Sequence, residues 1–130
     1  MNVFKKRRRS VWLLTLLFTL VTGFANAVDI MPPSDVREGM RGVAKTVVQG
    51  DTIEEFDVNV LGVLQQRGPS GDLILVKVSG PVIEKTGGIA QGMSGSPVYI
   101  DGKLVGAIGY GWGFADGTVG MVTPIGDMLK

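Results

Sequence analysis

The sequence predicts one all-β domain of about six strands, arranged as a small barrel or sandwich. Short runs of β-branched residues alternate with turn residues, and all but one of the 20 glycines follow residue 27. No long segment has the 3.6-residue periodicity of an amphipathic helix. The expected strands are residues 43–48, 56–60, 73–78, 98–100, 104–108 and 119–122.

Three of these strands have distinctive patterns. Phe56, Val58 and Val60 alternate with polar residues, as in a strand with one buried face. Residues 73–78 are almost continuously apolar, which is typical of a largely buried strand. Asp101 and Gly102 separate two apolar runs, and this pair is a strong signal for a two-residue hairpin turn.

A short helix is predicted after the last strand. Thr123 and Pro124 fit an N-cap and a first helical position. The sequence stops at Lys130, about two turns into this helix. We therefore expect a domain over residues 35–130 that is truncated inside its last helix.

The N-terminus has the pattern of a signal peptide over residues 1–27. Basic residues 5–9 precede an apolar run over residues 11–22, and Ala25 and Ala27 form a small-x-small cleavage site. The run is shorter than the roughly 20 residues of a membrane span. We expect an exported protein with a linker at residues 28–34; membrane attachment is expected only if the signal stays uncleaved.

Composition narrows the function classes. Five of the 13 basic residues lie in the signal, which leaves eight basic against 12 acidic residues, a net charge of −4. The excess of basic residues thus comes from the predicted signal peptide, and we expect no nucleic-acid partner. The sequence has no cysteine and no histidine, which excludes a cysteine nucleophile and disfavours zinc or other transition metals. No cofactor is expected.

The most informative motif is GMSGSP at residues 92–97, which is followed by the predicted hairpin. Chymotrypsin-like proteases present their nucleophilic serine between close glycines in this way. Glycine lets the backbone turn sharply, so that the serine oxygen stands clear and nearby amides are free for an oxyanion. Ser94 is the candidate nucleophile, and Ser96 is the rival with the weaker claim.

The absence of histidine conflicts with this motif, because histidine is the usual base for such a serine. Lys77 and Lys85 are the alternative bases, although one interrupts an apolar strand and the other falls in an expected loop. Asp72 and Glu84 are the nearest preceding acids, with no imidazole to orient.

Several segments, in this order, resemble the SpoIVB-type serine peptidase family, the peptidase domain of stage IV sporulation protein B. They are residues 39–42, 55–64, 72–76, 85–102, 109–112 and 123–125. The resemblance implies a chymotrypsin-like β-barrel and an exported endopeptidase that acts on a protein substrate. It matches Ser94 to the nucleophile and the amides of Gly92 and Ser94 to the oxyanion hole, whereas nothing matches the family's histidine. Proteases of this fold generally use two barrels, so we expect only the serine-bearing one here.

Substrate contacts are expected at Gly109, Gly111 and Trp112. Glycines leave a backbone edge with which an extended peptide can pair as an added strand. Trp112 fits the rim of that groove and equally fits a core aromatic. Two functions remain open: a serine endopeptidase completed by a histidine from elsewhere, and a non-catalytic peptide-binding or scaffold module that keeps the protease fold.

Overall fold

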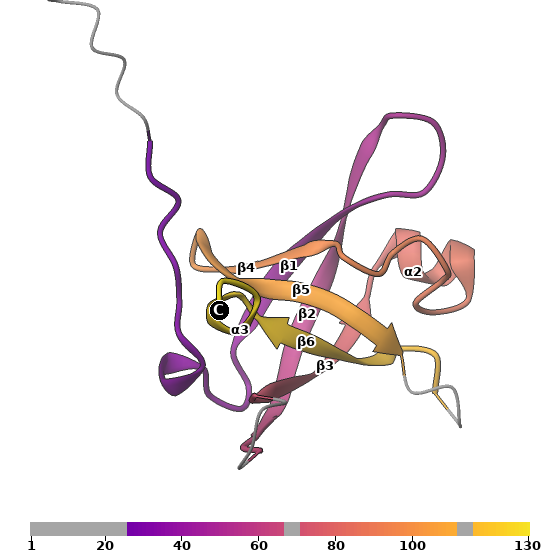
Figure 1. Cartoon of the computed structure of the whole chain (residues 1–130). Helices are drawn as coiled ribbons and strands as arrows, with labels where there is room; N and C mark the ends of the chain where they lie inside the picture. Colours follow the sequence, from indigo (N-terminus) through magenta and orange to yellow (C-terminus); the bar gives the residue numbers. More distant parts are fainter. Residues whose placement is uncertain (1–25, 67–70, 112–115) are drawn as a thin grey trace, which may run out of the picture.

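A computed structural model describes residues 26–66, 71–111 and 116–130 of the chain (Figure 1). Within these residues the elements are η1 (Pro33–Asp35), β1 (Arg41–Val47), β2 (Ile53–Leu64), β3 (Leu73–Ser79), α2 (Pro81–Thr86), β4 (Pro97–Ile100), β5 (Lys103–Gly111), β6 (Val119–Pro124) and α3 (Ile125–Met128).

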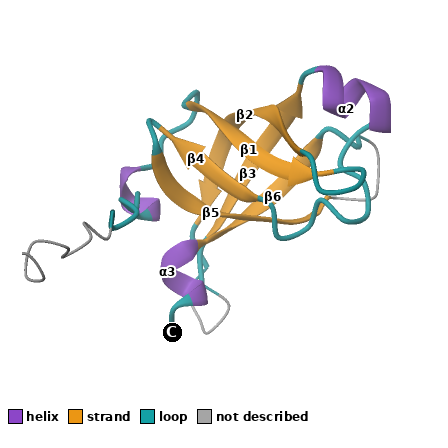
Figure 2. Ribbon diagram, turned by 90° about the horizontal axis from the view of Figure 1, so that it is seen from above, coloured by secondary structure: helices purple, strands orange, loops and turns teal. Residues whose placement is uncertain are grey.

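The strands close into one antiparallel barrel in the order β1-β2-β3-β6-β5-β4, and β4 then pairs with β1. Figure 2 shows this barrel from above, with the short helices α2 and α3 at opposite ends. The predicted all-β barrel is therefore confirmed, as is the short C-terminal helix. The position of β4 between β1 and β5 matters for the site, because the GMSGSP motif leads directly into β4.

Alternating side chains fill the barrel. Phe56, Val58 and Val60 are buried along β2, and the polar residues between them are exposed, as the pattern predicted. In β3 the alternation is stronger than its apolar composition indicated, because Lys77 faces outward between Val76 and Val78, which are buried. Buried β-branched side chains from opposing strands make the core.

The hairpin between β4 and β5 has the predicted turn. Asp101 and Gly102 both have positive φ, 51° and 74°, as a type I′ turn requires. This conformation matches the right-handed twist of the paired strands, so the two strands enter and leave the turn in register.

The predicted start of the last helix is wrong. Thr123 pairs with Ala107 and Pro124 pairs with Gly106 in the β5–β6 ladder, so both residues belong to β6. The helix begins at Ile125, and the residue in the N-cap position is Pro124, without a side-chain cap. Closure of the barrel outweighs the local capping preference of threonine.

Helix α2 was not predicted, and Lys85 lies in it rather than in a loop. Pro81 occupies its first turn, where the missing N–H is harmless, and Gly87 ends it in the left-handed conformation at φ 74°. Six residues are too short to show helical periodicity, and Gly80 next to Pro81 is typical of a turn.

The predicted signal peptide lies almost entirely outside the described residues, which begin at residue 26. Part of the expected linker lies on the barrel: the Leu104 N–H donates to the Asp29 carbonyl at 2.8 Å, and the Met31 N–H donates to Leu104 at 3.0 Å. Met31 is buried. In the ranges that the structure describes, no helix has both the length and the apolar character needed to cross a membrane.

Candidate active site

The loop that carries Ser94 owes its shape to two glycines. Gly92 and Gly95 have φ of 95° and 87°, values that side chains rarely adopt. An added Cβ would meet nothing within 4 Å at either position. The backbone conformation, rather than lack of space, therefore requires glycine on both sides of the serine.

Hydrogen bonds and one buried side chain hold this loop on the barrel. Met93 is 2% exposed and packs into the core. The Gly95 N–H donates to the Ile108 carbonyl at 2.7 Å, and the Ile108 N–H donates to the Ser96 carbonyl at 2.9 Å. Since Met93 points inward, the next side chain, Ser94, points outward and is exposed.

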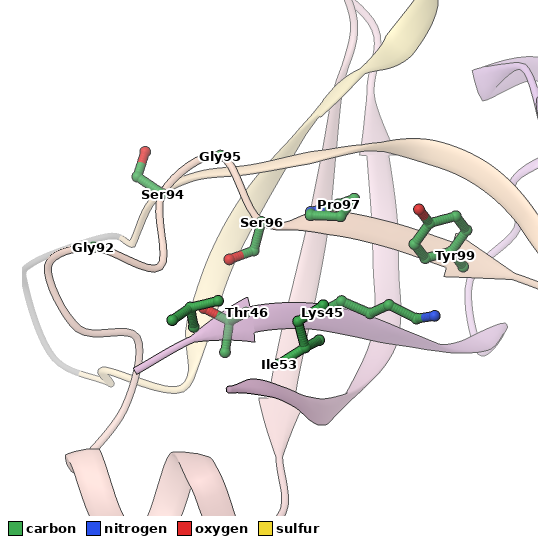
Figure 3. A pocket seen from close by; sticks show the side chains of 10 residues that line it. Lys45, Thr46, Ile53, Gly92, Ser94, Gly95, Ser96, Pro97 and Tyr99 are labelled. Atoms are coloured by element: carbon green, nitrogen blue, oxygen red, sulfur yellow. The ribbon is translucent and has the colours of Figure 1, made fainter. Parts of the chain in front are cut away.

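Three polar groups of the loop are available for contact: the Ser94 hydroxyl and two amides beside it. Among the described residues, no hydrogen bond uses the hydroxyl of Ser94 or the backbone N–H of Gly92 or Ser94. Figure 3 shows the Ser94 hydroxyl standing out from the loop, away from β1. Within the described residues the loop thus has an exposed hydroxyl and, beside it, two amide donors without partners, and amide donors of this kind are what an oxyanion hole requires.

An open groove of about 470 Å³ lies on the β1 side of this loop. It is lined by Lys45, Thr46, Val47, Ile53, Gly92, Ser94, Gly95, Ser96, Pro97 and Tyr99 (Figure 3). Val47 and Ile53 face each other across the β1–β2 hairpin and are 44% and 68% exposed. They give the groove an apolar wall.

A free strand edge lies on the β5 side of the same loop. The pairing of β4 with β5 stops at Pro97 and Ala107, but β5 continues to Gly111. Within the described residues, residues 109–111 have no strand partner on the β4 side. Gly109 and Gly111, two of the residues predicted to contact substrate, belong to this segment, whereas Trp112 falls outside the described residues.

A family model described as SpoIVB peptidase S55 matches residues 19–129. The chain belongs to this family. A search among curated proteins finds no match to the chain. The predicted resemblance is thus confirmed, and the barrel is a serine-peptidase-like domain with the chymotrypsin-like fold.

In the described part of this S55 domain, Lys77 and Lys45 have acidic partners, whereas Lys85 is exposed. Lys77 Nζ lies 3.8 Å from the Asp116 carboxylate, and hydrogen bonds from the Thr118 hydroxyl and amide, with Lys77 adding to them, lower the pKa of Asp116. Lys85 is exposed on α2. Lys45 Nζ lies 3.7 Å from Glu55 and 5.4 Å from the centre of the Tyr99 ring. No ammonium group in the described ranges donates a hydrogen bond to Ser94.

The acids predicted as partners also lie apart from Ser94. The Asp72 N–H donates to Asp127 of α3 at 3.2 Å, which ties Asp72 to the end of the barrel opposite α2. Glu84 is exposed on α2. No cluster of three or more potential metal ligands occurs in residues 26–66, 71–111 and 116–130.

The two serines of the motif occupy different environments. Ser96 is 6% exposed, and Figure 3 shows its hydroxyl pointing toward Thr46. Thr46 is 4% exposed, and its hydroxyl oxygen has no partner among the described residues. Of the two serines, Ser94 is the exposed one.

Sequence reasoning missed the residues that the β1–β2 hairpin contributes to the groove. The available signal was local: Val47, Val48 and Ile53 flank the polar turn at Gly50 and Asp51, where exposed residues are usually polar. All three are exposed apolar side chains in the structure. Nothing in the sequence, however, placed this hairpin next to Ser94.

Proposed function

We propose that this chain is the serine-bearing domain of an exported endopeptidase that acts on a protein or peptide substrate. Ser94 is the nucleophile, and the amides of Gly92 and Ser94 hold the oxyanion. The observation that carries the proposal is an exposed serine hydroxyl beside two amides on a glycine-shaped loop, none of which has a hydrogen-bond partner in the part of the chain that the structure describes. Membership of the S55 family supports it.

The chemistry follows from these groups. Ser94 Oγ attacks the carbonyl carbon of the peptide bond while a base takes its proton, and the carbonyl oxygen becomes an oxyanion. Two N–H donors stabilise this charge, and loss of one such donor typically costs about 3 kcal/mol. The C–N bond then breaks, the proton goes to the departing amine, and water hydrolyses the acyl ester on Ser94.

The base in this proposal is a histidine supplied by polypeptide outside residues 1–130. The sequence itself contains none. Of the two lysines considered as bases, Lys77 lies 3.8 Å from the Asp116 carboxylate and Lys85 is exposed on α2. A serine without a base is a weak nucleophile at neutral pH. The basic and apolar pattern of residues 1–27 supports export, with attachment to the membrane only if this segment is retained.

Added imidazole can stand in for the missing base and so tests the proposal. A fluorophosphonate is incubated with the full chain with and without imidazole, and the modified residue is identified by peptide mass spectrometry. We expect modification of Ser94 at a rate that rises with imidazole. Ser94→Ala should remove it, and Ser96→Ala should retain it. Equal labelling of Ser94→Ala, or no labelling of Ser94 at any imidazole concentration, contradicts the proposal.

A second candidate function is a non-catalytic module that binds extended peptides. The lack of histidine in the sequence favours it, as does the edge at residues 109–111, which has no described partner on the β4 side, because pairing with a strand edge requires no base. In this case Ser94→Ala should leave both peptide binding and any cellular phenotype unchanged. Loss of the phenotype in Ser94→Ala rejects the module and favours the peptidase.

A further inference from the structure

The groove and the free edge lie on opposite sides of the strand that follows Ser94. β4 is placed between β5 and β1 in the barrel, the free edge belongs to β5, and the groove is built on β1 and the β1–β2 hairpin. Ser94 lies in the loop that leads into β4, three residues before Pro97 (Figure 3). An extended peptide that pairs with β5 and crosses Ser94 therefore has its other half over the groove.

The two sides are suited to different halves of a substrate. The acyl half stays bound to Ser94 until water attacks, so it has to be held in register through both steps. Backbone pairing with residues 109–111 provides such a hold. The amine half must leave after the first step, and an open groove lined mainly by side chains permits its departure.

Side-chain contact dominates in this groove. Val47 and Ile53 are cross-strand partners, and Ile53 is 68% exposed although it is a large aliphatic residue. Pro97 and the Tyr99 ring add apolar surface. Covering such surface with an aliphatic side chain is favourable, whereas a small polar side chain gains little.

The charged group in the groove lining should contribute little to the choice of substrate side chain. Lys45 is the cation in the lining, and it lies 3.7 Å from Glu55 and over the Tyr99 ring. An acidic substrate side chain would have to compete with Glu55 for the same ammonium group. The groove therefore discriminates by apolar contact rather than by attraction of an acid.

We infer that the groove binds the leaving-group side of the substrate and selects an aliphatic residue directly after the cleaved bond. Ile53 and Val47 are the specificity-determining residues. The inference rests on the proposed function, since it needs an acyl group on Ser94 to define the two sides. It adds a substrate class to that function: chains with a leucine-like residue at the first leaving-group position.

Competition between water and an amine tests this inference directly. Ser94 is acylated by a p-nitrophenyl ester of a short peptide in imidazole buffer, and leucinamide or glycinamide is added as acceptor. The ratio of amide to acid product is measured by mass spectrometry, with Ser94→Ala as the background. We expect leucinamide to be about tenfold more effective than glycinamide, because its side chain covers Ile53 and Val47.

Two variants remove the apolar wall without entering the core. Ile53→Ser and Val47→Ser should each reduce the leucinamide preference to about threefold or less. Leu64→Ser is the matched control, since Leu64 is an exposed aliphatic residue at the far end of β2, and it should keep the full preference. Modification of Ser94 by a fluorophosphonate should be the same in the parent chain and in Leu64→Ser.

The outcomes separate the inference from the function on which it rests. Acylation of Ser94 without a leucinamide preference, or with one that survives in Ile53→Ser and Val47→Ser, overturns the groove assignment and leaves the peptidase proposal standing. Absence of any acyl group on Ser94 overturns both. A preference that is lost in these two variants and kept in Leu64→Ser supports the inference.

Discussion

The two flanks of the Ser94 loop are built differently. The β5 flank, residues 109–111, has no strand partner on the β4 side among the described residues, and it contains Gly109 and Gly111. The β1 flank is the groove, whose wall is the exposed pair Val47 and Ile53. Backbone pairing accepts most sequences, whereas an apolar wall distinguishes side chains. In the proposed account, the β5 edge accepts many substrate sequences, whereas the groove on the other side of Ser94 selects among substrate side chains.

This division depends on how closely the strands approach one another. Gly42 of β1 lies against the carbonyl of Tyr99 in β4, and Gly106 of β5 lies against the carbonyl of Thr123 in β6. A Cβ at either glycine would overlap backbone atoms, which cannot move aside as a flexible side chain can. Each flank is therefore fixed to its neighbour at a position where only glycine fits.

Gly42→Ala should have the largest effect. The added methyl group forces β1 away from β4, and we expect a loss of about 3 kcal/mol in the free energy of unfolding, measured by urea denaturation. Gly62→Ala is the control, because its Cβ would meet nothing within 4 Å. Equal stability of Gly42→Ala and Gly62→Ala would show that the close contact with Tyr99 is not present.

Backbone methylation should distinguish the two flanks next. A peptide ester whose residue opposite residues 109–111 is N-methylated loses a backbone hydrogen bond, so we expect it to acylate Ser94 about tenfold more slowly. An N-methylated amide group on leucinamide should change the efficiency of the acceptor less than about twofold. If methylation slowed the reaction of leucinamide and not that of the ester, the groove would be the side that pairs with substrate backbone, which contradicts the assignment.

Thr46→Val should stabilise the protein by about 1 kcal/mol, because the buried hydroxyl of Thr46 has no partner among the described residues. Thr86→Val is the matched control, since the Thr86 hydroxyl donates to carbonyl oxygens of Val82 and Gly88 at 3.0 and 2.7 Å. Removal of the Thr86 hydroxyl should lower the stability of the protein by a similar amount. Thermal unfolding of both variants measures the difference. If Thr46→Val destabilises the protein, the Thr46 hydroxyl has a hydrogen-bond partner after all.

The smallest effect is expected far from both flanks, at α3. The Lys130 ammonium group lowers the pKa of Asp127 below 3.8. In turn, the Asp127 carboxylate raises the pKa of Lys130 above 10.5. The contribution of Asp127 is present above pH 3.8 and is lost as the pH falls through its lower folded pKa. The contribution of Lys130 is present below pH 10.5 and is lost as the pH rises through its higher folded pKa.

Asp127→Asn should therefore lower the unfolding midpoint slightly at neutral pH and not at strongly acidic or strongly alkaline pH. Unfolding curves of the parent chain and the variant, taken across this range, measure the difference. Ser94 labelling should be equal in both proteins. A difference in midpoint that stays constant at every pH would rule out the ion pair as its source.

Much of the barrel was predictable because its signals are local. Alternation at Phe56, Val58 and Val60 and the turn at Asp101 and Gly102 each depend on a few neighbouring residues. Prediction failed at Thr123 and Pro124, where pairing with β5 overrides a local helix signal. It also missed α2, which is only six residues long.

The site was predictable in part for the same reason. Two glycines around Ser94 indicated an exposed turn, and the loop has that conformation. The groove was not predictable, because Val47 and Ile53 are far from Ser94 in sequence and reach it only through closure of β1 onto β4. Long-range pairing is not encoded in any short motif.

The central claim is that the Ser94 loop directs one hydroxyl and two amides at a single reacting group. A crystal structure of the fluorophosphonate adduct tests it most directly. We predict a phosphonyl group on Ser94 Oγ, with its oxygen about 3 Å from the backbone nitrogens of both Gly92 and Ser94. An adduct whose phosphonyl oxygen faces solvent, with these two amides turned elsewhere, would contradict the account.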